Sequence, residues 1–403
     1  MSLKKNIINL FGTQVVSYLV PLLQYPYLSR VLNTELLGLY IFSLSIIMIV
    51  TLIANFGFDI SLPKKIAEGF SSKKNLGELI TSVTIIKTFL LFISLLLFFI
   101  FNLYFHYYKY KVLFLMAIVC LANGYNFVWL YLGIEKLYIY SRINIITKLF
   151  SIAAIFLFIK KDSDFNLLFI IMACQSSLAL IISYIYIKKL QINFIKIKPN
   201  KLILIAKESF EYFISRIGVS LYSTCGSFFI GILSGSMHQV AIYGVAEQLY
   251  KAGVLVVSSI STPLTPYMVR TKNFNMFFKV TMLSMLITAM GACVGIFFGD
   301  KIIDMIYGEN LLSAYPVLII FMFTILISVL GIHFGYPALL PLNQARKANY
   351  SVIYAGILQI LLIFSIYMLH ITATAKIIAI TYLLCDLFML IYRLNIFIKN
   401  YGK

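Results

Sequence analysis

Long apolar runs alternate with short polar segments along the whole chain. About 20 apolar residues suffice for a helix to cross a bilayer. The bilayer core offers no water to backbone groups, so a run of this length must form a helix or a barrel strand, and period-two alternation is absent here. The pattern therefore predicts an all-α polytopic membrane protein. Asp, Glu, Lys and Arg are missing from residues 6–29, 36–58, 112–134, 165–187, 217–246, 280–299, 310–345 and 348–375.

The polar turns between these runs divide the chain into twelve predicted transmembrane helices. An even number of spans places both ends of the chain on the same side of the membrane. The predicted spans are 7–32, 36–57, 79–104, 112–133, 138–159, 165–187, 209–234, 239–262, 278–299, 314–338, 348–369 and 375–397.

Composition and charge agree with this topology. The chain is 61% hydrophobic and 12% charged, about half the charged fraction of a soluble domain. A net charge of +19 would suggest nucleic acid in a soluble protein. With the N-terminus in the cytoplasm, however, 22 of the 33 Lys and Arg residues, Arg393 included, fall in cytoplasmic segments and 7 in outer segments. This bias predicts that both termini are cytoplasmic, and no nucleic-acid partner is needed to explain the charge.

One connector divides the chain near its middle. The basic segment 189–208 contains Pro199 and separates a predicted N-terminal six-helix lobe, 1–188, from a C-terminal one, 209–403. A weak repeat supports the division, because Leu32–Tyr40 and Leu233–Tyr243 each place a polar turn before a small residue, an aliphatic residue and Tyr. Transporters built from two such halves bind substrate between them and open alternately to either side. We therefore expect two lobes around a central cavity.

Six ionisable residues lie deep inside predicted spans. A charge there costs several kcal/mol and usually faces a cavity or a partner. Glu247 and Lys251 are four residues apart on one helix face and can pair, either for function or only for structure. Lys87 and Arg216 are close enough to the cytoplasmic face to extend into the interface instead. Four cations against two anions leave a surplus of positive charge, which favours an anionic cargo. The six are Lys87, Lys148, Arg216, Glu247, Lys251 and Asp386.

The first span adds a polar stripe. Gln14, Tyr18 and Tyr25 share one helix face, and Arg30 follows at the outer end. Such a stripe suits a cavity lined for sugars or water, and it equally suits the aromatic belt of a membrane interface. The sequence contains no metal-ligand spacing, glycine-rich phosphate loop or nucleophile motif. We expect no cofactor, no metal and no enzymatic activity.

Six short segments carry a resemblance to a known family. Together they resemble the polysaccharide transporter family of the multidrug/oligosaccharidyl-lipid/polysaccharide exporter superfamily, and in particular its O-antigen flippases of the Wzx type. The family's usual Gly after Val31-Leu32 is Asn33 here, which changes one turn. The segments are Tyr27–Leu32 before Leu37–Tyr40, Asn55–Phe58, Gly133–Lys136, Tyr243–Leu249, Ile306–Asn310 and Pro341–Asn343.

The resemblance implies a flippase of the bacterial cytoplasmic (inner) membrane. Its cargo would be an O-antigen or similar repeat unit on undecaprenyl pyrophosphate, moved from the cytoplasmic to the periplasmic leaflet by alternating access. Membrane lipids, and the polymerase and chain-length regulator of the same pathway, would be partners. On charge grounds we expect Arg216, Lys251, Lys87, Lys148 and Arg30 to attract the pyrophosphate and Gln14 and Tyr18 to contact substrate. Glu247 and Asp386 would balance charge or carry a coupling ion.

Two other functions fit a chain of this length and hydrophobicity. An O-antigen polymerase or another polytopic glycan-assembly enzyme needs a sizeable outer loop or a carboxylate cluster, whereas the predicted outer loops here are short. A drug exporter of the same superfamily would favour acidic intramembrane residues, whereas those found here are mainly basic.

Overall fold

The computed structural model describes residues 20–401, and every regular element in that range is helical. Ten of its helices are long and apolar enough to cross a membrane. An eleventh candidate is the pair α9 (Pro199–Ser223) and α10 (Gly226–Ser234), which is bent by 62° at a short break. These match eleven of the twelve predicted spans. The remaining one, 7–32, lies partly outside the described residues, and its residues 20–31 are helical.

The outer surfaces of these helices are apolar. Phe92, Met282 and Phe297 are 66%, 74% and 74% exposed, and many other large apolar side chains are exposed on the same helices. Water-soluble proteins rarely expose contiguous apolar surface on this scale, whereas lipid chains accommodate it. The prediction of an all-helical, multi-span membrane protein therefore agrees with the structure.

The chain folds into two compact units. Among the described residues, unit 1 comprises Val20 and Ile46–Arg216, and unit 2 comprises Pro21–Ser45 and residues 217–401. These bounds differ from those of the predicted lobes. Part of the first two predicted spans belongs to unit 2, and the segment 189–208, predicted as a linker between lobes, packs as part of unit 1. The boundaries of the units fall inside α2 and α9 rather than in loops.

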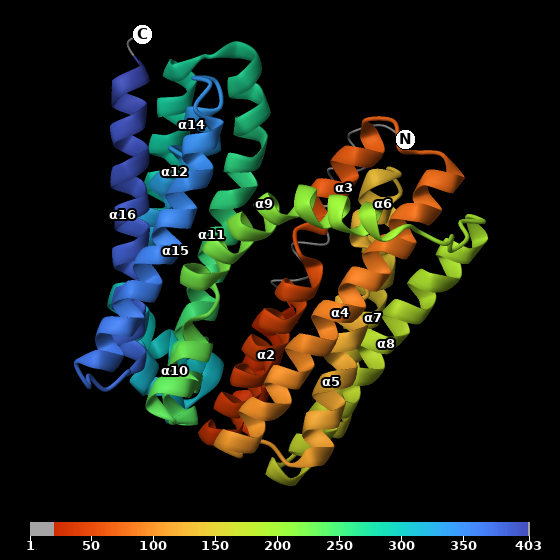
Figure 1. Ribbon diagram of the computed structural model, residues 1–403. Helices are drawn as coiled ribbons and strands as arrows, with labels where there is room; N and C mark the ends of the chain where they lie inside the picture. Colours follow the sequence, from red (N-terminus) through yellow and green to blue (C-terminus); the bar gives the residue numbers. More distant parts are fainter. Residues whose placement is uncertain (1–19, 402–403) are drawn as a thin grey trace. The chain divides into compact units, whose positions relative to one another are not determined.

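Unit 1 contains the second half of α2, the first part of α9 and six helices between them. In Figure 1, α4, α5, α7 and α8 run side by side, whereas the first part of α9 crosses their direction. The short α3 packs on the short α6. The bounds of the elements are α2 (Thr34–Asn55), α3 (Phe58–Ala67), α4 (Lys73–Phe105), α5 (Tyr110–Gly124), α6 (Val128–Gly133), α7 (Leu137–Phe158), η1 (Asp162–Asp164) and α8 (Phe165–Lys189).

Two spans of unit 1 are broken near the same end of the bundle. The break between α2 and α3 lies at Phe56 and Gly57, with φ of 44° and 75°. Glycine suits this left-handed conformation and also the close packing there, because a Cβ on Gly57 would lie 2.7 Å from the Phe213 backbone nitrogen. The break between α5 and α6 lies at residues 125–127. Breaks expose backbone groups that need partners inside a membrane, which makes their surroundings candidates for polar chemistry.

Unit 2 is a bundle in which α13 contacts α11, α12 and α16, and α15 contacts α16. Figure 1 shows α11, α12, α15 and α16 running alongside one another. The residues that follow α9 and α10 in this unit form α11 (Met237–Thr271), α12 (Phe274–Tyr307), η2 (Glu309–Ala314), α13 (Tyr315–His333), α14 (Tyr336–Leu339), α15 (Ala345–Met368) and α16 (Ala375–Tyr401).

The two segments of the proposed repeat lie against each other in unit 2. A Cβ on Gly38 would lie 1.8 Å from the Met237 carbonyl oxygen, so α2 approaches the start of α11 as closely as backbones allow. Both turns use the same kind of cap. The Asn33 side chain accepts from the Leu36 N–H at 2.9 Å, and Ser236 Oγ accepts from the Gln239 N–H at 3.4 Å. Asn33, which replaces the usual glycine, therefore serves as a helix cap.

Candidate functional site

The structure distributes the predicted site residues over both units. Lys87, Lys148 and Arg216 belong to unit 1, whereas Arg30, Glu247, Lys251 and Asp386 belong to unit 2. Gln14 and Tyr18 lie outside the described residues. Each unit therefore has its own set of candidate charges.

Lys87 joins the two helix breaks of unit 1. Its ammonium group donates to the carbonyl oxygens of Gly124 (2.7 Å) and Asn126 (3.2 Å) and to Asn55 Oδ1 (3.2 Å). The side chain is 2% exposed. An ammonium has three N–H donors, and all three have a protein acceptor here. Lys87 thus satisfies backbone groups released where α5 ends, and it ties that break to the end of α2.

Arg216 forms an ion pair within unit 1. Its Nη2 lies 2.5 Å from Asp59 Oδ2, and the two side chains are 46% and 26% exposed. Asp59 was not among the intramembrane charges predicted from the sequence. The pair joins α9 to α3 and leaves much of the guanidinium accessible. Lys148, on α7, is half-buried.

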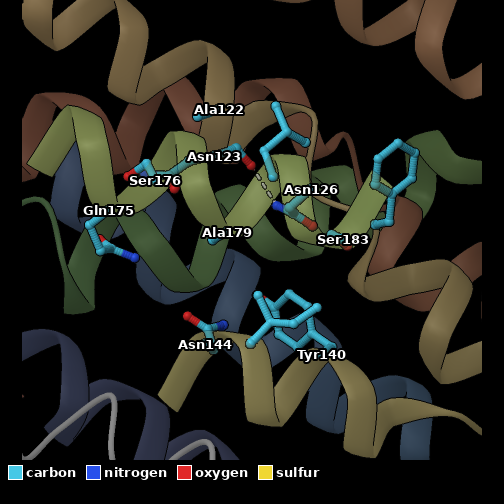
Figure 2. A pocket seen from close by; sticks show the side chains of 12 residues that line it. Ala122, Asn123, Asn126, Tyr140, Asn144, Gln175, Ser176, Ala179 and Ser183 are labelled. Atoms are coloured by element: carbon cyan, nitrogen blue, oxygen red, sulfur yellow. Dashed lines mark hydrogen bonds between the residues drawn. The ribbon is translucent and has the colours of Figure 1, made fainter. Parts of the chain in front are cut away.

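A small polar pocket lies between α5, α7 and α8 (Figure 2). Its volume is about 50 Å³, enough for a few water molecules and far less than a sugar repeat unit needs. Asn126 Nδ2 donates to the Asn123 carbonyl oxygen at 2.6 Å beside it, and Gln175 Nε2 donates to Thr147 Oγ1 at 3.4 Å. The residues lining it are Ala122, Asn123, Asn126, Phe127, Tyr140, Ile143, Asn144, Gln175, Ser176, Ala179, Leu180 and Ser183.

The residues of this pocket were not predicted, because only the intramembrane charges and the polar stripe of the first span served as signals in the sequence. A usable signal was present, since Asn144, Gln175 and Ser183 are polar positions inside otherwise apolar spans. Such positions usually face the interior of a bundle. Their convergence on one pocket still depends on how three helices pack.

A wider groove of about 840 Å³ lies between α3 and the first part of α9. Lys65 Nζ and Glu208 Oε2 pair across it at 2.6 Å. The groove carries three lysines and three glutamates, so its walls show no surplus of either charge. The charged residues lining it are Lys64, Lys65, Lys207, Glu68, Glu208 and Glu211.

In unit 2, Glu247 and Lys251 form the predicted pair. Lys251 Nζ lies 2.8 Å from Glu247 Oε2, and the side chains are 27% and 9% exposed. Glu247 Oε1 and the hydroxyls of Tyr243 and Tyr307 are buried without a hydrogen-bond partner in the described part of the chain. An unpartnered buried carboxylate oxygen is costly. This site therefore has the capacity to bind a further donor or cation.

Asp386 sits in a hydrogen-bonded network of α11, α13 and α16. It is 3% exposed and accepts a hydrogen bond from Ser328 Oγ. Ser328 Oγ also lies 2.8 Å from the Tyr250 hydroxyl, which lies 3.2 Å from the Tyr382 hydroxyl. The carboxylate is thus connected through hydroxyl groups to two buried tyrosines. Such a fully buried network holds the carboxylate and the two tyrosines in fixed positions.

Arg393 is a buried cation that was predicted from the sequence to be cytoplasmic. It is 8% exposed. Its Nε donates to Ser351 Oγ at 2.8 Å and its Nη1 to the Gly331 carbonyl oxygen at 2.6 Å. It therefore fastens α16 to α13 and α15. Sequence position alone could not show this, because Arg393 lies close to the polar end of its span.

Arg30 binds the end of another helix. Its Nη2 donates to the Met305 carbonyl oxygen in the last turn of α12. A cation is favourable there, because the final carbonyl groups of a helix lack intrahelical partners and carry partial negative charge. This contact gives Arg30 a structural role within unit 2.

The structure and the sequence were each compared with those of known proteins. The fold is similar to those of two solved membrane proteins, a transporter and a flippase. Over 100% of this chain and 94% of the other, it matches an inward-facing multidrug resistance MATE family transporter of the MOP superfamily, with a TM-score of 0.61 and 13% identity. It matches the lipid II flippase MurJ with a TM-score of 0.62 and 15% identity, over 92% of this chain and 87% of that one.

The family is shown by sequence. The model of the polysaccharide biosynthesis protein family matches residues 3–272, and the chain belongs to this family. Two relatives carry the name "Putative O-antigen transporter". The one from Escherichia coli (strain K12) is 26% identical over 90% of both chains. The one from Shigella dysenteriae is 24% identical over 76% of this chain and 78% of its own.

Proposed function

We propose that this protein transports O-antigen or a similar polysaccharide precursor across the bacterial inner membrane. The observation that carries the proposal is the match over 90% of both chains to a relative named for O-antigen transport, on a chain of membrane-spanning helices. The likeness in fold to a lipid II flippase supports a lipid-linked cargo. Transport rather than enzymatic chemistry also accords with the two families of solved structures that share the fold.

The proposed cargo is a repeat unit on undecaprenyl pyrophosphate, flipped from the cytoplasmic to the periplasmic leaflet. The lipid chain can stay among lipids while the polar head passes through the protein. We further propose twelve spans in two six-helix lobes around a central cavity, with alternating access. Both termini would be cytoplasmic, in accordance with the distribution of Lys and Arg. The pathway's polymerase and chain-length regulator would act with it.

The contacts within each unit divide the candidate cations by role. Lys87 and Arg30 donate to main-chain oxygens of their own unit, so their role is to hold helices of that unit in position. Arg216 and Lys251 are 46% and 27% exposed in their ion pairs, so they keep N–H groups able to reach a pyrophosphate. We propose these two, with Lys148, as the groups that attract the cargo. Glu247 and Asp386 would carry a coupling ion or balance charge.

Deletion of the gene followed by analysis of membrane lipids tests the function. Accumulation of single lipid-linked repeat units facing the cytoplasm is expected, with loss of surface polysaccharide. Units that are exported but not polymerised would instead indicate a polymerase and overturn the proposal. Restoration by the wild-type gene, but not by Glu247→Gln or Lys251→Ala at equal protein level, would support the assigned residues. Full surface polysaccharide with both variants would rule out the role given to that pair.

A further inference from the structure

The segment 189–216 is fixed to unit 1 along its whole length. The Ile195 N–H donates to Thr81 Oγ1 at 3.0 Å, and Lys73 Nζ donates to Gln191 Oε1 at 2.8 Å. Lys201 Nζ lies 2.7 Å from Glu78 Oε2. These contacts come from residues at the start of α4. The segment is therefore a fixed part of unit 1, and its outer surface has a defined direction.

The first part of α9 has two different faces. Ile205, Ser209, Tyr212 and Arg216 recur at helical spacing and form the inner face. Ile205 is 5% exposed within the core of unit 1, and Ser209 Oγ lies 2.7 Å from Ser61 Oγ. At Ile205 and Ser209 this side of the helix is therefore packed against the rest of unit 1.

The opposite face is apolar and basic. Ile203, Phe210 and Ile214 are 67%, 49% and 38% exposed, with Lys207 on the same stripe. Phe194, just before the helix, is 51% exposed. Exposed Ile and Phe side chains beside lysines are typical of helices that lie in the plane of a membrane interface. Figure 1 shows this part of α9 running across the direction of α4 and α8, as an interfacial helix would.

The end of α8 places the segment at the level of the headgroups. Lys188 Nζ lies 5.1 Å from the ring of Tyr184, and Lys189 Nζ lies 5.5 Å from the ring of Tyr186. Tyrosines concentrate at the membrane–water boundary, with lysines just beyond them. The chain then leaves the span and continues through Lys196 and Lys198, which are exposed and form no ion pair within the described residues.

We propose that the outer face of residues 188–214 is a docking surface for anionic phospholipid headgroups. Charge complementarity selects this occupant. Lys188, Lys189, Lys196, Lys198 and Lys207 supply positive charge, while Ile203, Phe210 and Ile214 insert among the upper acyl chains. The neighbouring groove between α3 and α9, which Lys207 also lines, is a poorer anion site, because its three lysines are matched by Glu68, Glu208 and Glu211. The surface anchors unit 1 to its leaflet, and this inference is independent of the cargo proposed above.

Fluorescence quenching of the full chain in lipid vesicles tests the proposal. The reporter variant Phe194→Trp is reconstituted in phosphatidylcholine vesicles that contain a fixed fraction of brominated phosphatidylglycerol or of brominated phosphatidylcholine. The protein without the reporter gives the background from Trp129, which is 2% exposed. We expect quenching by the brominated anionic lipid to be at least about twofold stronger. Salt should reduce the difference, since it screens exposed charges.

A matched pair of triple variants identifies the charges responsible. The first triple variant replaces Lys196, Lys198 and Lys207 by Gln. It should bring the ratio of quenching by the anionic lipid to quenching by phosphatidylcholine close to one. The control variant replaces Lys109, Lys111 and Lys161 by Gln, which removes the same charge from exposed positions at the opposite end of unit 1. It should leave the ratio unchanged. Equal quenching by both lipids in the parent reporter would overturn the anionic selectivity. No quenching by either lipid would show that position 194 lies away from the lipid, which would also overturn the proposal.

Discussion

The ammonium group of Lys87 lies 2.7 Å from the carbonyl oxygen of Gly124, the last residue of α5. The same ammonium reaches Asn55 and Asn126, so one side chain supports both helix breaks of unit 1. A charge that was predicted from the sequence to attract cargo thus has a complete set of protein partners. This contrast between a structural and a transport role can be tested.

Lys87→Met should destabilise the protein. The three lost hydrogen bonds correspond to about 2 kcal/mol, at the roughly 0.6 kcal/mol average for such bonds in membrane proteins. Unfolding in mixed detergent measures the change, with the exposed Lys111→Met as control. We expect lower stability and a matching fall in the amount of protein. Normal stability together with loss of surface polysaccharide would instead support a direct role of Lys87 in cargo binding.

Glu247 and Lys251 should show strong coupling in a double-mutant cycle. Lys251→Met leaves the Glu247 carboxylate buried without its cation, which costs about 3 kcal/mol when a buried pair is broken. The double variant Glu247→Gln/Lys251→Met should recover most of this stability, because no uncompensated charge remains. Surface polysaccharide should stay absent in the double variant. If transport recovers along with stability, the pair serves only the fold.

Substitution of Arg216 and substitution of its partner Asp59 should have different effects on transport. The pair is partly exposed, so either substitution should change stability by less than about 1 kcal/mol. Arg216→Gln removes the proposed cargo contact and should strongly reduce surface polysaccharide, whereas Asp59→Asn leaves the guanidinium in place and should have little effect. Quantitative staining of surface polysaccharide at equal protein level provides the measurement. Equal losses in the two variants would point to the ion pair itself rather than to cargo binding.

Gly38→Ala should disrupt the packing of α2 against α11. The added Cβ would lie 1.8 Å from the Met237 carbonyl oxygen, and the backbone must shift at a cost of about 3 kcal/mol. Gly291→Ala in α12 is the matched control, because a Cβ at that position would have no neighbouring atom within 4 Å. That substitution should be neutral or stabilise by up to about 1 kcal/mol through helix propensity. Thermal unfolding of the purified proteins distinguishes the two, and similar stabilities would contradict the close approach.

Local sequence determined the helices and the membrane class. An apolar run long enough to cross a bilayer has to satisfy its own backbone hydrogen bonds, so its helical form follows without knowledge of its neighbours. The Glu247–Lys251 contact was predictable for the same reason, since four residues separate the two on one helix. The sequence shows that Asn144 and Gln175 are polar positions, but it does not show that they line one pocket.

The tertiary structure decided which charges are engaged. Asp59 and Arg216 are 157 residues apart in the chain, and Lys65 and Glu208 are 143 apart, so only packing could bring them together. The same holds for Arg393, which lies near the polar end of its span and yet is buried. Burial and pairing depend on the side chains that other helices supply, whereas helix formation depends on the solvent around one segment. For this reason the sequence determined the spans of the chain, while packing determined the partners of its charges.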